Sequence, residues 1–208
     1  NLRSITFYMI MGIKNNGVIL MFEKMDLREY DIASANINIL YSIGYIDKEL
    51  YDKLDNSSKK KRVIHIGKMM KEDDELYDIL MNRIREHVDK FIADNGLDNH
   101  IYERVKDAVW VYGKVPSKTQ YGKYIKFANK RRASSVMSIS NGNIKFYYNS
   151  TYGKLFTRGL GDIDHEEYPF LNKIKRFMGL KESGNYKMLY KKLHKFQQGC
   201  LRGDLDHR

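Results

Sequence analysis

The sequence predicts an α+β fold in which helices pack on one side of an antiparallel sheet. Segments rich in β-branched and aromatic residues are separated by Asn-Gly pairs, which favour the positive φ angles of hairpin turns. Between residues 76 and 92, apolar side chains recur every three or four positions, which indicates an amphipathic helix. A chain of 208 residues is long enough for one globular domain. We therefore expect residues 1–208 to form a single domain, with its core at about residues 18–170.

The N-terminal half is predicted to hold a hairpin, a short strand and three helices. Ser34 is the candidate N-cap of the first helix, which Gly44 ends, and Asp47 is the candidate N-cap of the second. The third helix begins after Gly67 and ends at Gly96. In chain order, the predicted segments are a hairpin of residues 5–11 and 18–22 with Asn16-Gly17 in its turn, a strand at 30–32, the first two helices, a polar and basic connection at 56–62, and the long helix around 76–92.

The C-terminal half is predicted to hold strands followed by two basic helices. Lys106-Asp107 is the best turn position within the alternating segment 101–112, and Asn141-Gly142 supplies another hairpin turn. In chain order, the predicted segments are the hairpin 101–112, strands at 121–127 and 136–148, helices at 170–180 and 186–196, and a frayed tail at 199–208.

The net charge of +11 indicates a polyanionic partner, for which nucleic acid is the usual candidate. Basic residues gather at 114–132 without an acidic one, and aromatic residues alternate with lysines there, as on surfaces that bind single strands. The candidate nucleic-acid-binding residues are Lys118, Tyr121, Lys123, Tyr124, Lys126, Lys130, Arg131 and Arg132. The same pattern fits a solvated strand whose aromatic face is core, and a lysine-rich composition also fits a phage or an AT-rich host.

The remaining composition excludes several classes of protein. The single cysteine, Cys200, rules out an intrachain disulfide framework and a zinc site built from cysteines. No apolar run approaches the ~20 residues that cross a bilayer, so we expect no membrane partner. Together these features favour the reducing cytoplasm of a bacterium or of a phage-infected host.

Two aspartates lie in short motifs that resemble those of a known enzyme class. Asp31 lies in Tyr30-Asp31-Ile32-Ala33-Ser34-Ala35-Asn36, and Asp107 lies in Val105-Lys106-Asp107-Ala108-Val109. These segments resemble the palm domain of template-dependent nucleic-acid polymerases, in which one aspartate ends a strand before a helix and another is presented by a hairpin turn. The resemblance covers about residues 29–112.

The resemblance implies a palm-like core that catalyses Mg²⁺-dependent nucleotidyl transfer. Asp31 and Asp107 would be the catalytic and metal-binding residues, with their carboxylates within ~4–6 Å of each other on adjacent strands. Arg62, Lys68 and Lys71 occupy the place of the residues that bind the incoming triphosphate in that family. The chain departs from the pattern at Lys106 and Ala108, where many members carry a second acid beside the aspartate.

Several alternatives stay open from the sequence alone. Asp31 and Asp107 also fit a capping residue and a turn residue without catalytic function. The chain then fits a non-catalytic, basic nucleic-acid-binding accessory subunit of a phage or mobile-element replication or transcription assembly. A basic interaction protein with an acidic protein partner is a further alternative.

Overall fold

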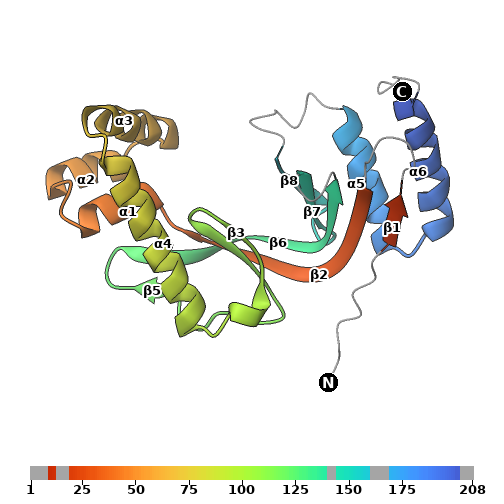
Figure 1. Ribbon diagram of the computed structural model, residues 1–208, viewed down its shortest axis with the longest axis horizontal. Helices are drawn as coiled ribbons and strands as arrows, with labels where there is room; N and C mark the ends of the chain where they lie inside the picture. The colour runs from red at the N-terminus through yellow and green to blue at the C-terminus, as the bar shows by residue number, and fades with distance from the viewer. Residues whose placement is uncertain (1–8, 13–18, 140–143, 160–168, 202–208) are drawn as a thin grey trace. The chain divides into compact units, whose positions relative to one another are not determined.

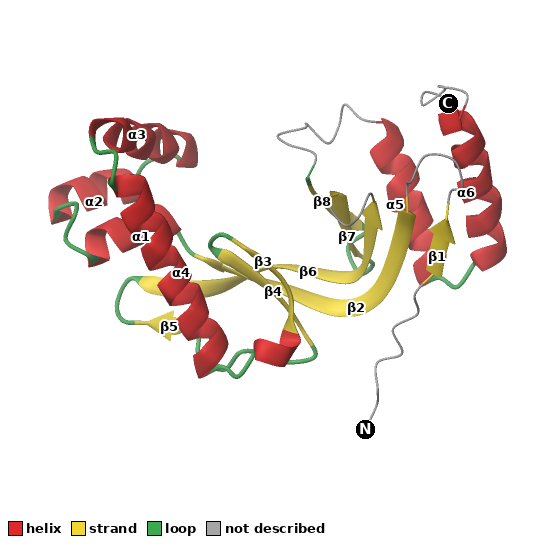
Figure 2. Cartoon of the chain, viewed as in Figure 1, coloured by secondary structure: helices red, strands yellow, loops and turns green. Residues whose placement is uncertain are grey.

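The computed structural model describes residues 9–12, 19–139, 144–159 and 169–201 (Figure 1). It confirms the α+β class, with helices on one side of an antiparallel sheet (Figure 2). The chain divides into two compact units, a central unit of Arg28–Arg131 and a terminal unit of Asn1–Leu27 with Arg132–Arg208. Strands β2 (Ile19–Ile32) and β6 (Ile125–Ile139) contribute residues to both. The single-domain expectation stays a prediction.

The central unit combines helices with the strand order β3-β4-β2-β6. Strands β3 (Ile101–Val105) and β4 (Ala108–Tyr112) form the antiparallel hairpin that the sequence predicts. The remaining elements are α1 (Ala35–Ser42), α2 (Lys48–Asp55), α3 (Lys59–Glu72), α4 (Leu76–Asp94), the 3₁₀ helix η1 (Asp98–His100) and β5 (Gln120–Tyr121). This order places the end of β2 between the β3–β4 hairpin and β6.

Helix α4 supplies much of the core of the central unit, and its predicted periodicity is confirmed. The apolar positions of that periodicity are all buried: Leu76, Leu80, Ile84, Val88 and Phe91. The ring of Phe91 stacks on that of Phe127 from β6, with centroids 4.1 Å apart. Helix α4 thereby fixes the buried face of the strands that end at the candidate aspartates.

The terminal unit pairs further strands antiparallel and covers them with two helices. Its elements, besides its parts of β2 and β6, are β1 (Met9–Gly12), β7 (Ile144–Asn149), β8 (Lys154–Arg158), α5 (Pro169–Glu182) and α6 (Tyr186–Leu201). Strand β1 pairs with β2, and the order continues through β6, β7 and β8. Phe146 of β7, Phe177 of α5 and Leu189 of α6 are buried in its core. No described helix has both the length and the apolar character needed to cross a bilayer.

The structure corrects the predicted connection at 56–62 and the Ser34 cap. Helix α3 begins at Lys59, because Ser58 caps it by accepting a hydrogen bond from Lys61 N–H at 3.4 Å. Lysine and arginine are good helix formers, so the basic run extends the helix instead of breaking it. Ser34 stands at the N-cap of α1 in the left-handed region and makes no side-chain cap, whereas Asp47 caps α2 as predicted.

Other differences concern lengths and positions of elements. Strand β2 is one continuous strand where the sequence predicts two short ones, and β8 follows β7 in a segment for which the sequence predicts no element. Helix α6 continues to Leu201, so residues 199–201, which the sequence predicts to belong to a frayed tail, are helical. The predicted turns at Asn16-Gly17 and Asn141-Gly142, and residues 202–208, lie outside the described residues.

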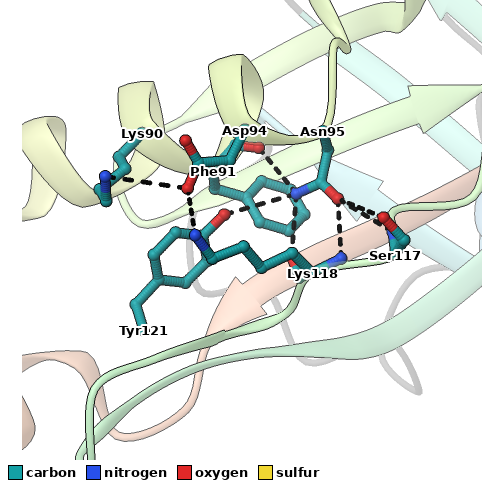
Figure 3. Close-up of polar contacts among 7 residues, drawn as sticks. All are labelled: Lys90, Phe91, Asp94, Asn95, Ser117, Lys118 and Tyr121. Atoms are coloured by element: carbon teal, nitrogen blue, oxygen red, sulfur yellow. Dashed lines mark hydrogen bonds and ion pairs between the residues drawn. The ribbon is translucent and has the colours of Figure 1, made fainter.

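Asn95, which follows α4, holds the loop that leads into β5 (Figure 3). Its side-chain Oδ1 accepts hydrogen bonds from the backbone N–H groups of Ser117 and Lys118 at 2.9 and 2.8 Å. Its Nδ2 donates to the carbonyl oxygens of Phe91 and Lys118 at 2.9 and 2.8 Å. The Asn95 side chain is buried, so it replaces water for all of these backbone groups.

Asn95→Ala should therefore lower the free energy of unfolding by about 2 kcal/mol, because it leaves buried backbone groups without partners. For a chain of this length the loss corresponds to a fall in Tm of ~4–8 °C in thermal unfolding followed by circular dichroism. Asn82→Ala on the exposed surface of α4 is the matched control, with an expected change within ~0.5 kcal/mol. Equal Tm values for the two variants would contradict this role for Asn95.

Candidate nucleotidyl-transfer site

Asp31 and Asp107 lie beside each other in the central unit. Asp31 is the next-to-last residue of β2, and Asp107 lies in the turn between β3 and β4. The backbone N–H of Ile32 donates to the carbonyl oxygen of Asp107 at 3.1 Å, which joins the end of the strand to the turn. Both residues line the same cavity, and the two carboxyl groups are close enough for the charge of Asp31 to raise the pKa of Asp107. The two sequence-predicted aspartates are therefore brought together on neighbouring elements.

Strand alternation and a tight turn give these side chains their direction. Tyr30 and Ile32 are buried in the core, so Glu29 and Asp31 lie on the opposite face of β2. The turn places Lys106 at φ 43°, in the left-handed region that glycine or asparagine usually occupies in hairpin turns. Strained turn residues of this kind are found at functional sites when the surrounding structure holds them in place.

The pair carries an electrostatic cost. Burial raises the pKa of Asp107, and the negative charge of Asp31 and a hydrogen bond with Asp31 raise it further. Burial also raises the pKa of Glu29, against the lowering effect of the Arg131 and Lys130 charges. The folded state therefore disfavours the charged form of Asp107, and a cation between the carboxylates would relieve that repulsion.

Basic residues of β6 pair with the acidic residues of β2. The three ion pairs are Lys130–Asp31, Arg131–Glu29 and Arg132–Asp26. The Arg131–Glu29 pair joins Nη1 to Oε2 at 3.3 Å, and Glu29 is buried. Three of the residues predicted to bind nucleic acid thus already neutralise carboxylates within the protein.

A cavity of about 420 Å³ opens at the two aspartates. Besides Asp31 and Asp107, it is lined by the β2–α1 segment 32–37, by Ala128 and Lys130 of β6, and by Lys59, Arg62, Val63 and Ile66 of α3. Lys59, Arg62 and Ile66 share one face of α3, because residues three and four apart lie on the same side of a helix. A volume of this size falls within the range of small-molecule sites.

Lys68 and Lys71, which the sequence assigns to the triphosphate together with Arg62, do not line this cavity. Both lie on α3 but at a different helical phase from Arg62, and both are exposed. Of the three predicted residues, only Arg62 faces the aspartates. Lys59 takes the place of the other two.

The start of α1 also borders the cavity. The first helical hydrogen bond runs from Asn38 N–H to the carbonyl oxygen of Ser34 at 3.1 Å, so the N–H groups of Ala35, Asn36 and Ile37 have no acceptor within the helix. No side chain caps this end. Unpaired N–H groups at a helix start favour negatively charged ligands, and phosphate is one of them.

The predicted nucleic-acid-binding tyrosines separate into two environments. Tyr121 is only 7% exposed and packs edge-on against Phe127, so its ring belongs to the core and not to a stacking surface. Tyr124 is half-buried beside Tyr41, with ring centroids 4.8 Å apart, and beside Tyr51. The ammonium group of Lys123 lies over the Tyr124 ring at 5.3 Å.

Two further predicted contacts, Lys118 and Lys126, differ in their engagement. Lys118 forms an ion pair with Asp94 at 2.6 Å, beside the Asn95 hydrogen bonds (Figure 3). Lys126 is exposed on β6, and its carbonyl oxygen accepts a hydrogen bond from Ala33 N–H. Several cations of the predicted basic segment 114–132 thus form ion pairs within the protein, whereas Lys123 and Lys126 are exposed and form no ion pair with a carboxylate among the described residues.

Sequence comparison gives the chain a family. Residues 7–208 match the family described as the bacteriophage PBS1 gene 130 protein, which is nearly the whole chain. The chain belongs to this PBS1 gene 130 family. No curated protein and no solved structure matches it. The phage origin, which the composition suggested as one of two explanations, is therefore confirmed. The resemblance to polymerase palm domains stays a prediction.

The donor set of this PBS1 gene 130 family member fits Mg²⁺. The buried Oδ1 of Asp31 receives no hydrogen bond from a described N–H or O–H group and lies beside the Asp107 carboxyl group. No three His, Cys, Asp or Glu side chains form a metal-binding cluster in the described part of the chain. Mg²⁺ suits a site of one or two carboxylates, because it usually keeps water and substrate phosphate as its other ligands.

Sequence reasoning missed Lys59, Glu29 and the free start of α1. The i, i+3 spacing of Lys59 and Arg62 would have placed both on one face if the basic run had been recognised as a helix. The alternation of Glu29 with Asp31 was visible, but its Arg131 partner lies far away in the sequence. Nothing in the sequence indicates that Ser34 fails to cap α1.

In this PBS1 gene 130 family member, Asp107→Asn should raise Tm by ~2 °C in metal-free buffer at neutral pH, because it removes a disfavoured charge beside Asp31. The gain stays small because Asp107 is only partly buried, so solvent screens its charge. The folded-state pKa of Asp107 is raised, so the wild type gains stability relative to the variant as pH falls through that value. The difference in Tm should therefore shrink on acidification. The exposed Asp74→Asn is the control, and a lower Tm for Asp107→Asn than for Asp74→Asn would contradict the repulsion.

Proposed function

We propose that this phage protein catalyses Mg²⁺-dependent nucleotidyl transfer to a nucleic acid, in the cytoplasm of the infected host. The observation that carries the proposal is the pairing of Asp31 and Asp107, far apart in sequence, at the mouth of a cavity with basic residues. Two carboxylates surrounded by basic residues suit a reaction between a hydroxyl group and a triphosphate.

The cavity residues take distinct roles in this proposal. Asp31 and Asp107 hold the metal, and Lys59 and Arg62 neutralise the phosphates from the facing side of α3. The N–H groups at the start of α1 bind phosphate oxygens. When bound, Mg²⁺ would polarise the reacting phosphate and lower the pKa of the attacking hydroxyl.

The transfer itself needs no covalent enzyme intermediate. A hydroxyl oxygen of the acceptor forms a bond to the α-phosphorus of the triphosphate, and the bond to the bridging oxygen breaks. Pyrophosphate leaves with that electron pair, and the hydroxyl proton passes to solvent. Positioning and charge neutralisation by the chain's own residues supply the catalysis. Lys130, which pairs with Asp31, would supply a further cation for the phosphates when Asp31 and Asp107 hold a metal.

The test is incorporation of labelled nucleotides into oligonucleotide primers, with and without template, in the presence of Mg²⁺. The wild type should extend the primer, and Asp31→Asn and Asp107→Asn should each lower the rate by at least ~10²-fold while remaining folded. Asp74→Asn should keep full activity. Equal rates in wild type and both aspartate variants, or no extension by any protein, would remove the catalytic proposal.

The role of α3 gives a separate prediction. Arg62→Gln and Lys59→Gln should each weaken nucleoside triphosphate binding about 5- to 100-fold, because each removes a cation that faces the cavity. Lys71→Gln on the same helix is the control and should bind with nearly unchanged affinity. Isothermal titration calorimetry with a non-hydrolysable triphosphate measures both. Equal losses in all three variants would mean that general charge, and not the cavity, attracts the ligand.

A non-catalytic nucleic-acid-binding protein is the second candidate, and the ion pairs favour it. Lys130 and Arg131 already neutralise Asp31 and Glu29, so these carboxylates also fit a purely structural role. Exposed cations such as Lys123 and Lys126 would still bind phosphates. This candidate predicts strongly salt-dependent binding that does not change with Mg²⁺ or with Asp31→Asn.

A further inference from the structure

Helix α3 carries two basic faces that point in different directions. With 100° between successive residues, Lys60, Lys61, Ile64, Lys68 and Lys71 fall within an arc of about 100°. The residues that line the cavity fall within a second arc of about 100°, centred roughly opposite the first. We call the first arc the outer face of α3. It contains the two lysines that the sequence assigned to the triphosphate and that the structure places elsewhere.

The lysines of the outer face are exposed and form no ion pair among the described residues. They are Lys60, Lys61, Lys68 and Lys71. They differ in this respect from Lys130 and from the other basic residues that pair with β2. The charge of the outer face is therefore available to a partner.

One apolar side chain lies among these lysines. Ile64 is 51% exposed between Lys60 and Lys68, which stand four residues before and after it. The inward side of α3 meets the core through Ile66, Met69 and Met70, so packing of the helix does not require Ile64. A single apolar residue is too little for a membrane surface, which needs a whole apolar face.

We propose that the outer face of α3 binds the phosphodiester backbone of a nucleic acid. The four lysines extend over 12 residues, or about 16 Å along the helix, which is roughly five times the ~3.4 Å spacing of phosphates along one strand of a duplex. Lysine acts as a point charge and fits backbone contacts without sequence preference. Ile64 contacts the apolar side of sugars or bases. The proposal rests on the proposed function in one respect, since it takes the bound strand to be the nucleic acid on which the Asp31–Asp107 site acts.

The variant that tests the outer face replaces Lys60, Lys61, Lys68 and Lys71 together with glutamine, which keeps helix propensity. The matched control replaces four exposed lysines of the terminal unit with glutamine: Lys175, Lys187, Lys191 and Lys195. Both variants lose the same charge, and circular dichroism checks that both stay folded. Fluorescence anisotropy with labelled single-stranded oligonucleotides, across a salt series, measures affinity and its salt dependence.

The outer-face variant should reduce the slope of log K against log salt by about 3, because each phosphate that a lysine neutralises on a single strand adds roughly 0.7 to that slope. Its affinity at low salt should fall at least tenfold, whereas the control should change the slope by less than about 1. Equal changes in the two variants, or no binding by the wild type, would overturn the proposal. Polyglutamate competing as well as an oligonucleotide of equal charge would also overturn it and indicate an acidic protein partner.

Failure of this proposal and failure of the proposed function are distinguishable. The outer-face variant should keep the Mg²⁺-dependent rise in Tm and the triphosphate affinity of the wild type, because its substitutions leave the cavity intact. If Mg²⁺ and triphosphate fail to bind the wild type while the slope changes as expected, the outer face stands and catalysis fails. If Mg²⁺ and triphosphate bind and the slope is unchanged, the site stands and the outer face fails.

Discussion

The close approach of two carboxyl groups, where β2 meets the β3–β4 turn, is the constraint on which the rest of the site depends. The backbone hydrogen bond from Ile32 to Asp107 fixes this approach, and the buried residues Tyr30 and Ile32 prevent the strand from turning its acidic face inward. The protein must therefore supply positive charge at this point. Lys130 provides part of it, and a divalent cation would provide more.

This arrangement lowers the stability of the folded protein but provides the carboxylates that a metal site needs. Burial and the neighbouring negative charge disfavour ionised Asp107 in the folded state, although an ionised carboxylate is what a metal needs. Retaining such a pair is costly for a purely structural turn, since asparagine would fit the same position without the repulsion. The cost is understandable if a ligand recovers it, which is the usual trade-off at binding sites.

The sequence predicted those features that depend on local pattern. The periodicity of α4, the β3–β4 hairpin and the two short aspartate motifs were all readable from nearby residues. The predictions that failed concerned residues that are far apart in the sequence, or the helical phase of a residue. Ion pairs between β2 and β6 join residues about a hundred positions apart, so the basic triplet at 130–132 looked free. Tyr121 and Tyr124 looked alike, yet only the pairing of β5 with β6 decides that the first is buried. Lys68 could be separated from Arg62 only after 56–62 was known to enter a helix.

The central claim is that Asp31 and Asp107 together hold a divalent cation. The most direct measurement is a crystal structure of the wild type soaked in Mn²⁺, with anomalous scattering recorded at the manganese edge. The account predicts an anomalous peak about 2.1–2.3 Å from carboxylate oxygens of both residues, with the ammonium group of Lys130 displaced from Asp31. A map without a peak at this position, with Lys130 still paired to Asp31, would contradict it.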